Sequence, residues 1–326
     1  MFRKILYFFK ILLLILLSNN FIHSEEPVKK IAILYFENTI LPEKITSAEL
    51  GLYNVDRQYD YLERAFTDML ISDLADTKDI ELVERSKVEK LLDEIRFGET
   101  GLIDENTVQK AGKALQADYL IFGYIDKKKS KIVLRAKIQN VSNRQITKLE
   151  PISDFENNIF ELEKNLYLNI CKNMQMSFEK ETKKIKIEKN STLAILPFNN
   201  NSKTEELNYL QSSLSELLAN DLVNYKIFKL VEREKIDAVL KELALQRTGI
   251  IDEKTAVQIG KLLGAKYILS GSFISSQSVI RTDMKVVTVG TGKTILMAQA
   301  TGNKNDLFKI CTNLTRKLFN KIKTIQ

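Results

Sequence analysis

The sequence TGLIDENT, at residues 100–107, recurs almost unchanged as TGIIDEKT at residues 248–255. A shift of 148 residues aligns residues 82–125 with residues 230–273 without a gap, and 19 of these 44 paired positions are identical. A match of this length indicates a tandem duplication, in which each copy forms one structural unit.

The match extends towards the N-terminus, where IAILYFEN at residues 31–38 pairs with LAILPFNN at residues 193–200. The offset here is 162 residues, so copy one carries 14 additional residues, which fall within residues 39–61. Long insertions are tolerated best in surface loops, and we expect such a loop here.

Each copy alternates short apolar runs, typical of buried strands, with amphipathic segments that predict helices. The predicted order in each copy is strand, helix, strand, helix, helix and strand, followed by a β-hairpin and a closing helix. The sequence therefore predicts the α/β class: two tandem three-layer domains, each a mixed sheet packed by helices. The predicted domains span residues 28–178 and 192–324, and a charged linker at residues 179–191 joins them. Predicted helices lie at 62–75, 87–95 and 155–178 in copy one, and at 210–223, 235–243 and 306–322 in copy two.

The repeated segment itself is interpreted as a loop that leads into a helix. Its glycine, Gly101 or Gly249, suits a turn with a positive φ angle, and its aspartate, Asp104 or Asp252, is placed to cap the helix that follows. The shared residues to which we assign structural roles are Glu84, Arg85, Gly101, Asp104, Gly112 and Gly123 in copy one, and Glu232, Arg233, Gly249, Asp252, Gly260 and Gly271 in copy two.

The pairs Glu84–Arg85 and Glu232–Arg233 lie where a predicted strand runs into a helix. Two interpretations are open: a polar functional site, or capping and ion pairing that fix this corner of the fold. Their presence in both copies favours the structural role. A hydrolase that uses Asp104 as an acid is the least favoured alternative, because no pair of acids recurs at a spacing that would place both in one cleft.

The N-terminus has the features of a secretory signal peptide at residues 1–24. Arg3 and Lys4 precede an apolar segment, and Ser24 offers a small residue for cleavage. An uncleaved anchor is the alternative, but the apolar run at residues 11–17 is shorter than the roughly 20 residues that span a bilayer. No Cys lies near the cleavage point, so we expect a periplasmic protein that is neither a lipoprotein nor, after cleavage, membrane-spanning. Removal of the leader lowers the net charge from +7 to +4, because three basic residues leave with it.

The composition argues against several classes of function. The only histidine, His23, lies in the predicted leader, which excludes Ser–His–Asp catalysis and His-ligated metal sites from the mature chain. No basic stripe with interleaved aromatic residues indicates nucleic-acid binding. VGTGKT at residues 289–294 lacks the first glycine of a phosphate loop, since position 287 is Val287, and predicts a hairpin turn instead. We therefore expect no enzyme, no cofactor and no metal.

The two cysteines, Cys171 and Cys311, occupy equivalent places in the two closing helices. Export would permit a disulfide. Small apolar side chains at matching positions of two modules favour two buried free thiols instead.

The repeated motifs resemble those of the CsgG family of bacterial envelope proteins, which includes the curli-secretion subunit, LpoB-like activators of peptidoglycan synthases and the N-terminal domain of TolB. The matching residues are Leu34, Phe36, Val83, Glu84, Arg85, Leu92, Gly101, Asp104, Gly112, Ala117, Tyr119 and Gly123, and in copy two Leu196, Pro197, Phe198, Val231, Glu232, Arg233, Leu240, Gly249, Asp252, Gly260, Ala265, Tyr267 and Gly271. The resemblance covers both halves and implies two CsgG-like domains.

The resemblance further implies a protein that acts by binding envelope proteins in assembly, secretion or regulation of envelope structures, with self-association as an additional expectation. A secretion pore subunit and an activator of a peptidoglycan synthase remain alternatives. The pore is disfavoured, because the segments at residues 126–154 and 274–306 are short and the first is crowded with lysines. Partner contacts are expected at a sheet edge, the hairpins or the loop within residues 39–61.

Overall fold

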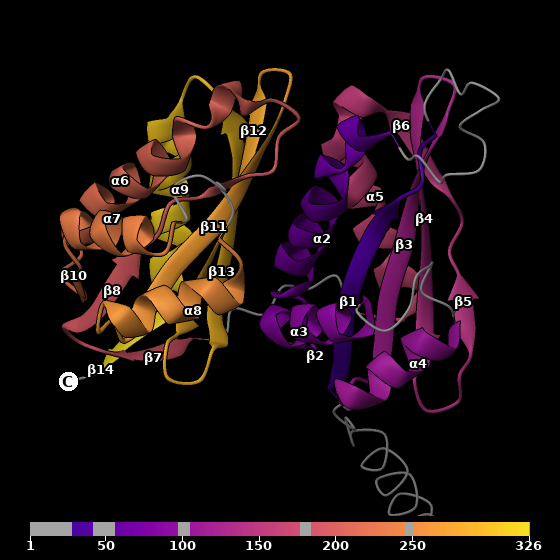
Figure 1. Ribbon diagram of the computed structural model, residues 1–326, viewed down its shortest axis with the longest axis horizontal. Coiled ribbons are helices and arrows are strands. Elements are labelled where there is room, and N and C mark those ends of the chain that lie inside the picture. Colours follow the sequence, from indigo (N-terminus) through magenta and orange to yellow (C-terminus); the bar gives the residue numbers. More distant parts are fainter. Residues whose placement is uncertain (1–27, 42–55, 97–104, 177–183, 245–250, 326) are drawn as a thin grey trace, which may run out of the picture.

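A computed structural model describes residues 28–41, 56–96, 105–176, 184–244 and 251–325. The chain forms two similar modules that lie side by side (Figure 1). Module one comprises the described residues from 28 to 176, and module two those from 184 to 325. The predicted signal peptide, including His23, and most of the copy-one insertion lie outside the described residues.

Module one has a mixed sheet with strand order β2-β1-β3-β4-β5, and β6 also pairs with β4. β1 is parallel to β2 and β3, whereas β4 is antiparallel to β3, β5 and β6. The strands are β1 (Lys29–Asn38), β2 (Ile80–Leu82), β3 (Tyr119–Lys128), β4 (Lys131–Asn140), β5 (Ile146–Lys148) and β6 (Ile152–Phe155). A right-handed crossover by helices is the usual way to connect such parallel neighbours.

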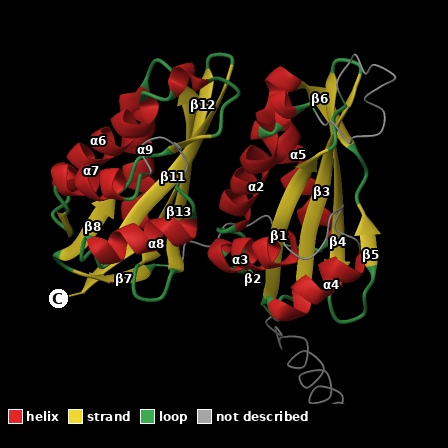
Figure 2. Ribbon diagram, in the orientation of Figure 1, coloured by secondary structure: helices red, strands yellow, loops and turns green. Residues whose placement is uncertain are grey.

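Helices cover both faces of this sheet, so module one has three layers (Figure 2). Successive side chains of a strand point to opposite faces. Ile31 and Ile33 of β1 therefore pack with α2 and α5, whereas Ala32 and Leu34 pack with α3 and α4. The helices are α2 (Tyr61–Leu74), α3 (Arg85–Arg96), α4 (Glu105–Ala114) and α5 (Ile159–Asn173), with short 3-10 turns η2 (Arg57–Tyr59) and η3 (Glu156–Asn158).

Module two repeats this plan with strand order β10-β8-β11-β12-β13, and β9 pairs with β11. α6 and α9 pack on one face, and α7 and α8 on the other. The strands are β8 (Ser191–Ile195), β9 (Asn199–Asn200), β10 (Phe228–Leu230), β11 (Tyr267–Ser276), β12 (Val279–Thr288) and β13 (Lys293–Asn303). The helices are α6 (Leu210–Val223), α7 (Arg233–Glu242), α8 (Glu253–Leu262) and α9 (Leu307–Asn320), with the 3-10 turn η4 (Glu205–Leu207).

The predicted fold class is confirmed: each module is a mixed sheet between helical layers and closes with a hairpin and a helix. VGTGKT forms the turn between β12 and β13, as the hairpin interpretation predicted. Within the described ranges, no helix combines the length and the apolar character that crossing a membrane requires.

The expected linker at residues 179–191 differs from the structure in its second half. Residues Ile185–Glu188 form β7, which pairs in parallel with β14 (Ile322–Ile325) at the end of the chain. Ile187 is fully buried in the core of module two. The alternation of Ile with Lys and Glu in this strand was hidden by the high charge of the segment.

The two thiols lie in separate hydrophobic cores, Cys171 in that of module one and Cys311 in that of module two. They therefore do not bond to each other. Burial, followed by the nearby Asp221 carboxylate, raises the pKa of the Cys311 thiol to about 12. The sulfur is thus an apolar part of the core at neutral pH.

Gly271, in the middle of β11, packs against a neighbouring strand and an aromatic ring. A Cβ atom there would overlap the backbone oxygen of Asp283 and the ring of Phe198. We expect Gly271→Ala to lower the free energy of unfolding by about 2 kcal/mol, because the backbone oxygen cannot move aside cheaply. Urea unfolding measures this. Gly290→Ala is the control, since a Cβ at Gly290 would meet no atom within 4 Å, and equal losses in the two variants would contradict the packing argument.

Candidate functional site between the two modules

The largest collection of buried polar side chains lies where module one meets module two. Helix α2 of module one contacts β12 and β13 of module two, on the sheet face that α7 and α8 cover only in part. Alternate residues of β12 point to this face, and three of them, Arg281, Asp283 and Lys285, are charged. Charges at these strand positions require polar partners, and module one supplies them.

Arg281 is the centre of the first polar cluster. Its guanidinium lies 2.9 Å from an oxygen of Asp73 on α2 and 3.1 Å from an oxygen of Glu163 on α5, and it donates to the backbone oxygen of Met69 at 3.0 Å. Asp283 on the same strand accepts from it at 2.9 Å. One cation from module two thus binds two carboxylates of module one, and few water molecules can compete because every side chain is at least 87% buried.

Burial governs the protonation of this cluster. It raises the pKa of Glu163 well above its usual range, although Arg281 opposes this, and the nearby Asp73 raises it further. Burial likewise raises the pKa of Asp283, with Arg281 opposing it. For Arg281 burial acts downward, but the surrounding carboxylates outweigh it and raise its pKa overall, so the guanidinium stays charged.

Glu253, the first residue of α8, is the centre of the second cluster. It accepts from the backbone amide of Ser86 in module one at 2.7 Å and from the Thr294 hydroxyl at 3.1 Å, and it pairs with Lys285 at 3.0 Å. Burial acts to raise the pKa of Glu253, but Lys285 and the two hydrogen bonds lower it overall. The first-turn acid therefore joins the two modules, beyond its expected effect on the helix dipole.

Two further contacts connect the modules at the periphery. Lys321 donates to Asp76 of α2 at 2.5 and 2.7 Å and to the backbone oxygen of Met297 at 2.6 Å. Asp68 of α2 accepts from the Asn201 amide at 2.8 Å and from the Ser272 hydroxyl at 3.1 Å. In both cases the acid comes from module one and the donor from module two.

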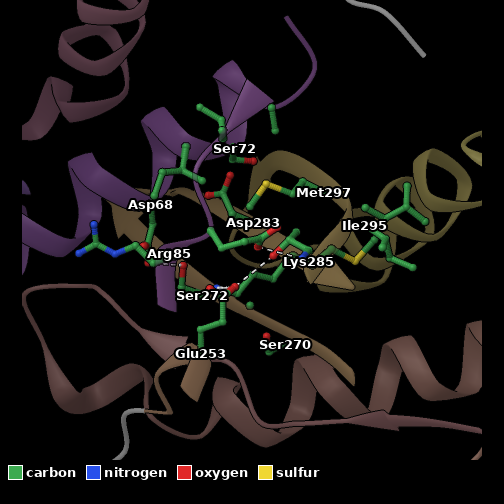
Figure 3. Close-up of a pocket in the computed structure, with 18 of the residues that line it drawn as sticks. Asp68, Ser72, Arg85, Glu253, Ser270, Ser272, Asp283, Lys285, Ile295 and Met297 are labelled. Carbon is green, nitrogen blue, oxygen red and sulfur yellow. Dashed lines mark hydrogen bonds and ion pairs between the residues drawn. The ribbon is translucent and has the colours of Figure 1, made fainter. Parts of the chain in front are cut away.

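These clusters surround a cavity of about 330 Å³ between the modules (Figure 3). Module one contributes Asp68, Ser72 and Arg85 to its wall. Module two contributes polar side chains including Glu253, Ser270, Asp283 and Lys285, and the apolar Ile295 and Met297. Among the residues that the structure describes, no group of three or more His, Cys, Asp or Glu side chains is arranged to hold a metal ion.

Several residues singled out from the sequence converge on this cavity. Glu84, Arg85, Asp252 and Gly271 all line it, although the first two belong to module one and the others to module two. Gly112 and Gly260 instead lie in their own modules, where an added Cβ would overlap a valine of the adjacent core. Gly123 packs against Phe36 as Gly271 packs against Phe198. Gly101, Asp104 and Gly249 lie outside the described residues.

The two repeated acid–arginine pairs differ in what they contact. Arg85 donates to the backbone oxygen of Leu34 at 2.5 Å and pairs with Glu89, which fixes the corner of module one. Glu84 instead accepts from the backbone amide of Thr294 in module two at 3.0 Å. This differs from the expectation that it serves only its own corner. Burial raises the pKa of Glu84.

In module two the corresponding pair stays within its own corner. Arg233 pairs with Asp237 at 3.0 Å and donates to the hydroxyl of Ser215 at 3.2 Å. Glu232 pairs with the exposed Lys235 at 2.9 Å. Equivalent letters in the two copies thus have different partners, because only the copy-one corner faces another module.

Asp252 accepts from the backbone amide of Thr255 at 2.6 Å, at the N-cap of α8. We expect Asp252→Ala to lower the free energy of unfolding by about 1 kcal/mol, because the amide then loses its acceptor. Thermal and urea unfolding measure this loss. Asp252→Ser is the matched variant and should retain most of the stability. A loss several times larger, or none, would contradict a simple capping role.

Sequence reasoning missed the residues that connect the modules, above all Arg281, Asp73 and Glu163. One signal was present: VIRTDMKVV places charges at alternate positions of a predicted strand, which marks a polar sheet face. Nothing in the sequence identified the partner of that face.

Comparison with known proteins follows the two modules. The family model described as curli production assembly/transport component CsgG matches residues 35–131 and 185–306. A comparison with curated proteins found no match. Among solved structures, the chain is similar to the LpoB C-terminal domain from Salmonella enterica, with 22% identity over 36% of this chain and 86% of that one, and a TM-score of 0.32. The PelC dodecamer from Paraburkholderia phytofirmans has 15% identity over 44% of this chain and 95% of that one, with a TM-score of 0.31. TolB from Acinetobacter baumannii has 11% identity over 41% of this chain and 28% of that one, with a TM-score of 0.29.

Proposed function

Since the chain belongs to the CsgG family, we propose that it is a non-enzymatic periplasmic protein that binds other proteins in the assembly, secretion or regulation of bacterial envelope structures. The family description names curli assembly and transport, which supports an envelope role. Export by the leader at residues 1–24 and the absence of lipidation are parts of this proposal.

The observation that carries the proposal is the use made of the polar residues at the candidate site. The carboxylates of Asp73, Glu163 and Glu253 each contact a cation or a backbone amide across the boundary between the modules. A catalytic carboxylate must instead face a substrate with its lone pairs or proton available. Side chains committed in this way hold two binding modules in one orientation.

The surfaces that remain exposed suit protein contacts. Tyr209 at the start of α6 is 65% exposed and Phe308 at the start of α9 is 73% exposed, both in module two. Exposed aromatic side chains of this kind are enriched at protein interfaces. Phe155, at the end of β6 in module one, is also exposed.

Photo-cross-linking in intact bacteria tests the proposal. A photoreactive amino acid would replace Tyr209, Phe308 or Phe155 in the full chain, and captured proteins would be identified by mass spectrometry. We expect the chain in the osmotic-shock fluid and cross-linked to envelope proteins. The matched control carries the same photoreactive residue in a chain without residues 2–24. Retention of the full chain in the cytoplasm, or the same captured proteins with and without the leader, would contradict the proposal.

A further inference from the structure

The two modules are related by a head-to-tail arrangement. In Figure 1 both modules show the same orientation, with α6 and α9 to the left of the module-two strands and α2 and α5 to the left of the module-one strands. The helical layer of module one therefore faces the sheet of module two, and Arg281 bonds to α2 and α5 across this boundary. Such a heterologous contact uses a different surface on each partner.

A heterologous pair leaves one surface of each kind without its counterpart. In this chain these are the outer face of α6 in module two and the sheet face formed by β3 and β4 in module one. Figure 2 shows them at opposite ends of the molecule, with α6 on the left and β4 on the right. A second copy of the chain presents the complementary surface to each of them.

The helix face keeps the acidic character that the contact uses. At the 148-residue offset, Asp68 and Asp73 of α2 correspond to Glu216 and Asp221 of α6. Glu216 is exposed and Asp221 is partly exposed. Val223, one turn further along, is 58% exposed and adds an apolar contact. This face therefore offers the negative charge that α2 offers inside the chain.

The sheet face keeps the basic character of its counterpart. Asp283 and Lys285 of β12 correspond to Arg135 and Lys137 of β4. The side chain of Arg135 is 51% exposed, and its pair with Asp126 is long, at 3.6 Å. Lys137 lies over the ring of Phe122, 5.7 Å from its centroid, which makes this face both basic and aromatic.

We propose that these two surfaces bind each other between chains: the acidic face of α6 in one copy packs on the basic face of β3 and β4 in the next. The contact repeats the arrangement that already joins module one to module two. It is weaker than the contact within the chain, because Val133 stands at the position of Arg281 and no buried arginine cluster forms. Because the interface is heterologous, assembly continues from chain to chain until it closes into a ring or grows as a filament.

Sedimentation velocity of the mature full chain tests this proposal, with one charge reversal at each surface. We expect the mass of the wild type to rise with protein concentration and to fall as salt is added. Glu216→Arg and Arg135→Glu should each weaken self-association by about tenfold or more, because each places like charges opposite each other. Neither change touches the hydrophobic cores, so the midpoint of thermal unfolding should hardly change in either variant.

Mixing the two variants gives the sharpest result. In a mixture of Glu216→Arg and Arg135→Glu chains, every contact between unlike variants pairs opposite charges, so we expect association to return. Lys226→Glu, at an exposed position beyond α6, is the control for a change of net charge alone. A chain that stays monomeric at all concentrations would overturn the proposal, as would self-association that is indifferent to both reversals or is not restored by mixing.

The inference rests on the proposed function only in assuming that the chain acts by binding proteins. The two fail separately. A monomeric chain that still captures envelope proteins would overturn the self-association and leave the proposed function standing. Charge-dependent assembly of a chain that stays in the cytoplasm would do the reverse.

Discussion

Arg281→Met should lower the free energy of unfolding by about 4 kcal/mol, because it leaves three buried carboxylates without their cation. Arg281 contacts Asp73, Glu163 and Asp283, and it is itself only 7% exposed. Methionine keeps most of the volume of the side chain, so the loss reflects charge rather than a cavity. Urea unfolding at neutral pH measures it.

Arg135→Met is the matched control, since it removes an exposed arginine from the corresponding face of module one. Its ion pair at 3.6 Å is exposed, and we expect a loss below about 1 kcal/mol. Adding Glu163→Gln and Asp283→Asn to Arg281→Met should recover part of the stability, because neutral side chains are cheaper to bury than unpaired carboxylates. A loss no larger than that of the control would show that the cluster contributes nothing to stability.

The loss should also depend on pH. The pKa values of Glu163 and Asp283 are already raised in the folded protein, and removal of Arg281 raises them further. A carboxyl group with a raised folded pKa binds its proton more tightly in the folded than in the unfolded state, so the fold gains stability as the pH falls. The penalty of Arg281→Met should therefore be smaller at mildly acidic pH than at neutral pH.

The second large effect is expected at Glu253. Glu253→Gln removes the charge opposite Lys285, which is only 22% exposed, and we expect a loss of about 3 kcal/mol at pH 7. The pKa of Glu253 is lowered in the folded state from its ordinary value of 4.5. Its ion pair therefore contributes stability above that ordinary value, and the contribution is lost as the pH falls through the lowered folded pKa. The difference between wild type and Glu253→Gln should accordingly disappear in acid.

Glu84→Gln should give the opposite sign. Burial raises the pKa of Glu84, so its ionised form is unfavourable in the folded state at neutral pH. A glutamine oxygen still accepts from the amide of Thr294, and we expect a neutral or stabilising change at pH 7 that vanishes as the pH approaches 4.5. Comparing the two variants by urea unfolding across this range checks both. Equal losses at pH 7 would contradict the assignment of one paired and one unpaired carboxylate.

Local patterns predicted the modules well, because each signal lies within one short segment. IAIL and LAIL are buried on both faces, and the amphipathic segment at residues 210–223 forms a helix with the same bounds. β7 was missed because its partner, β14, lies more than 130 residues away, and four residues of mixed polarity give no clear strand signal alone.

The candidate site could be predicted only in part, for the same reason. Self-comparison identified Glu84, Arg85 and Asp252 because they are repeated, and these residues do line the cavity. The cluster around Arg281 is not repeated, since Val133 takes its place in copy one. Its meaning depends on how one module sits on the other, which no pattern within a single copy specifies.

The central claim is that the buried charges join two modules into one rigid body that works by binding. Differential scanning calorimetry of the mature chain tests this most directly. A joined pair should unfold in one transition whose calorimetric enthalpy equals the van't Hoff enthalpy. Two separate transitions, each with about half the enthalpy and neither shifted by Arg281→Met, would show that the modules fold independently and would contradict the claim.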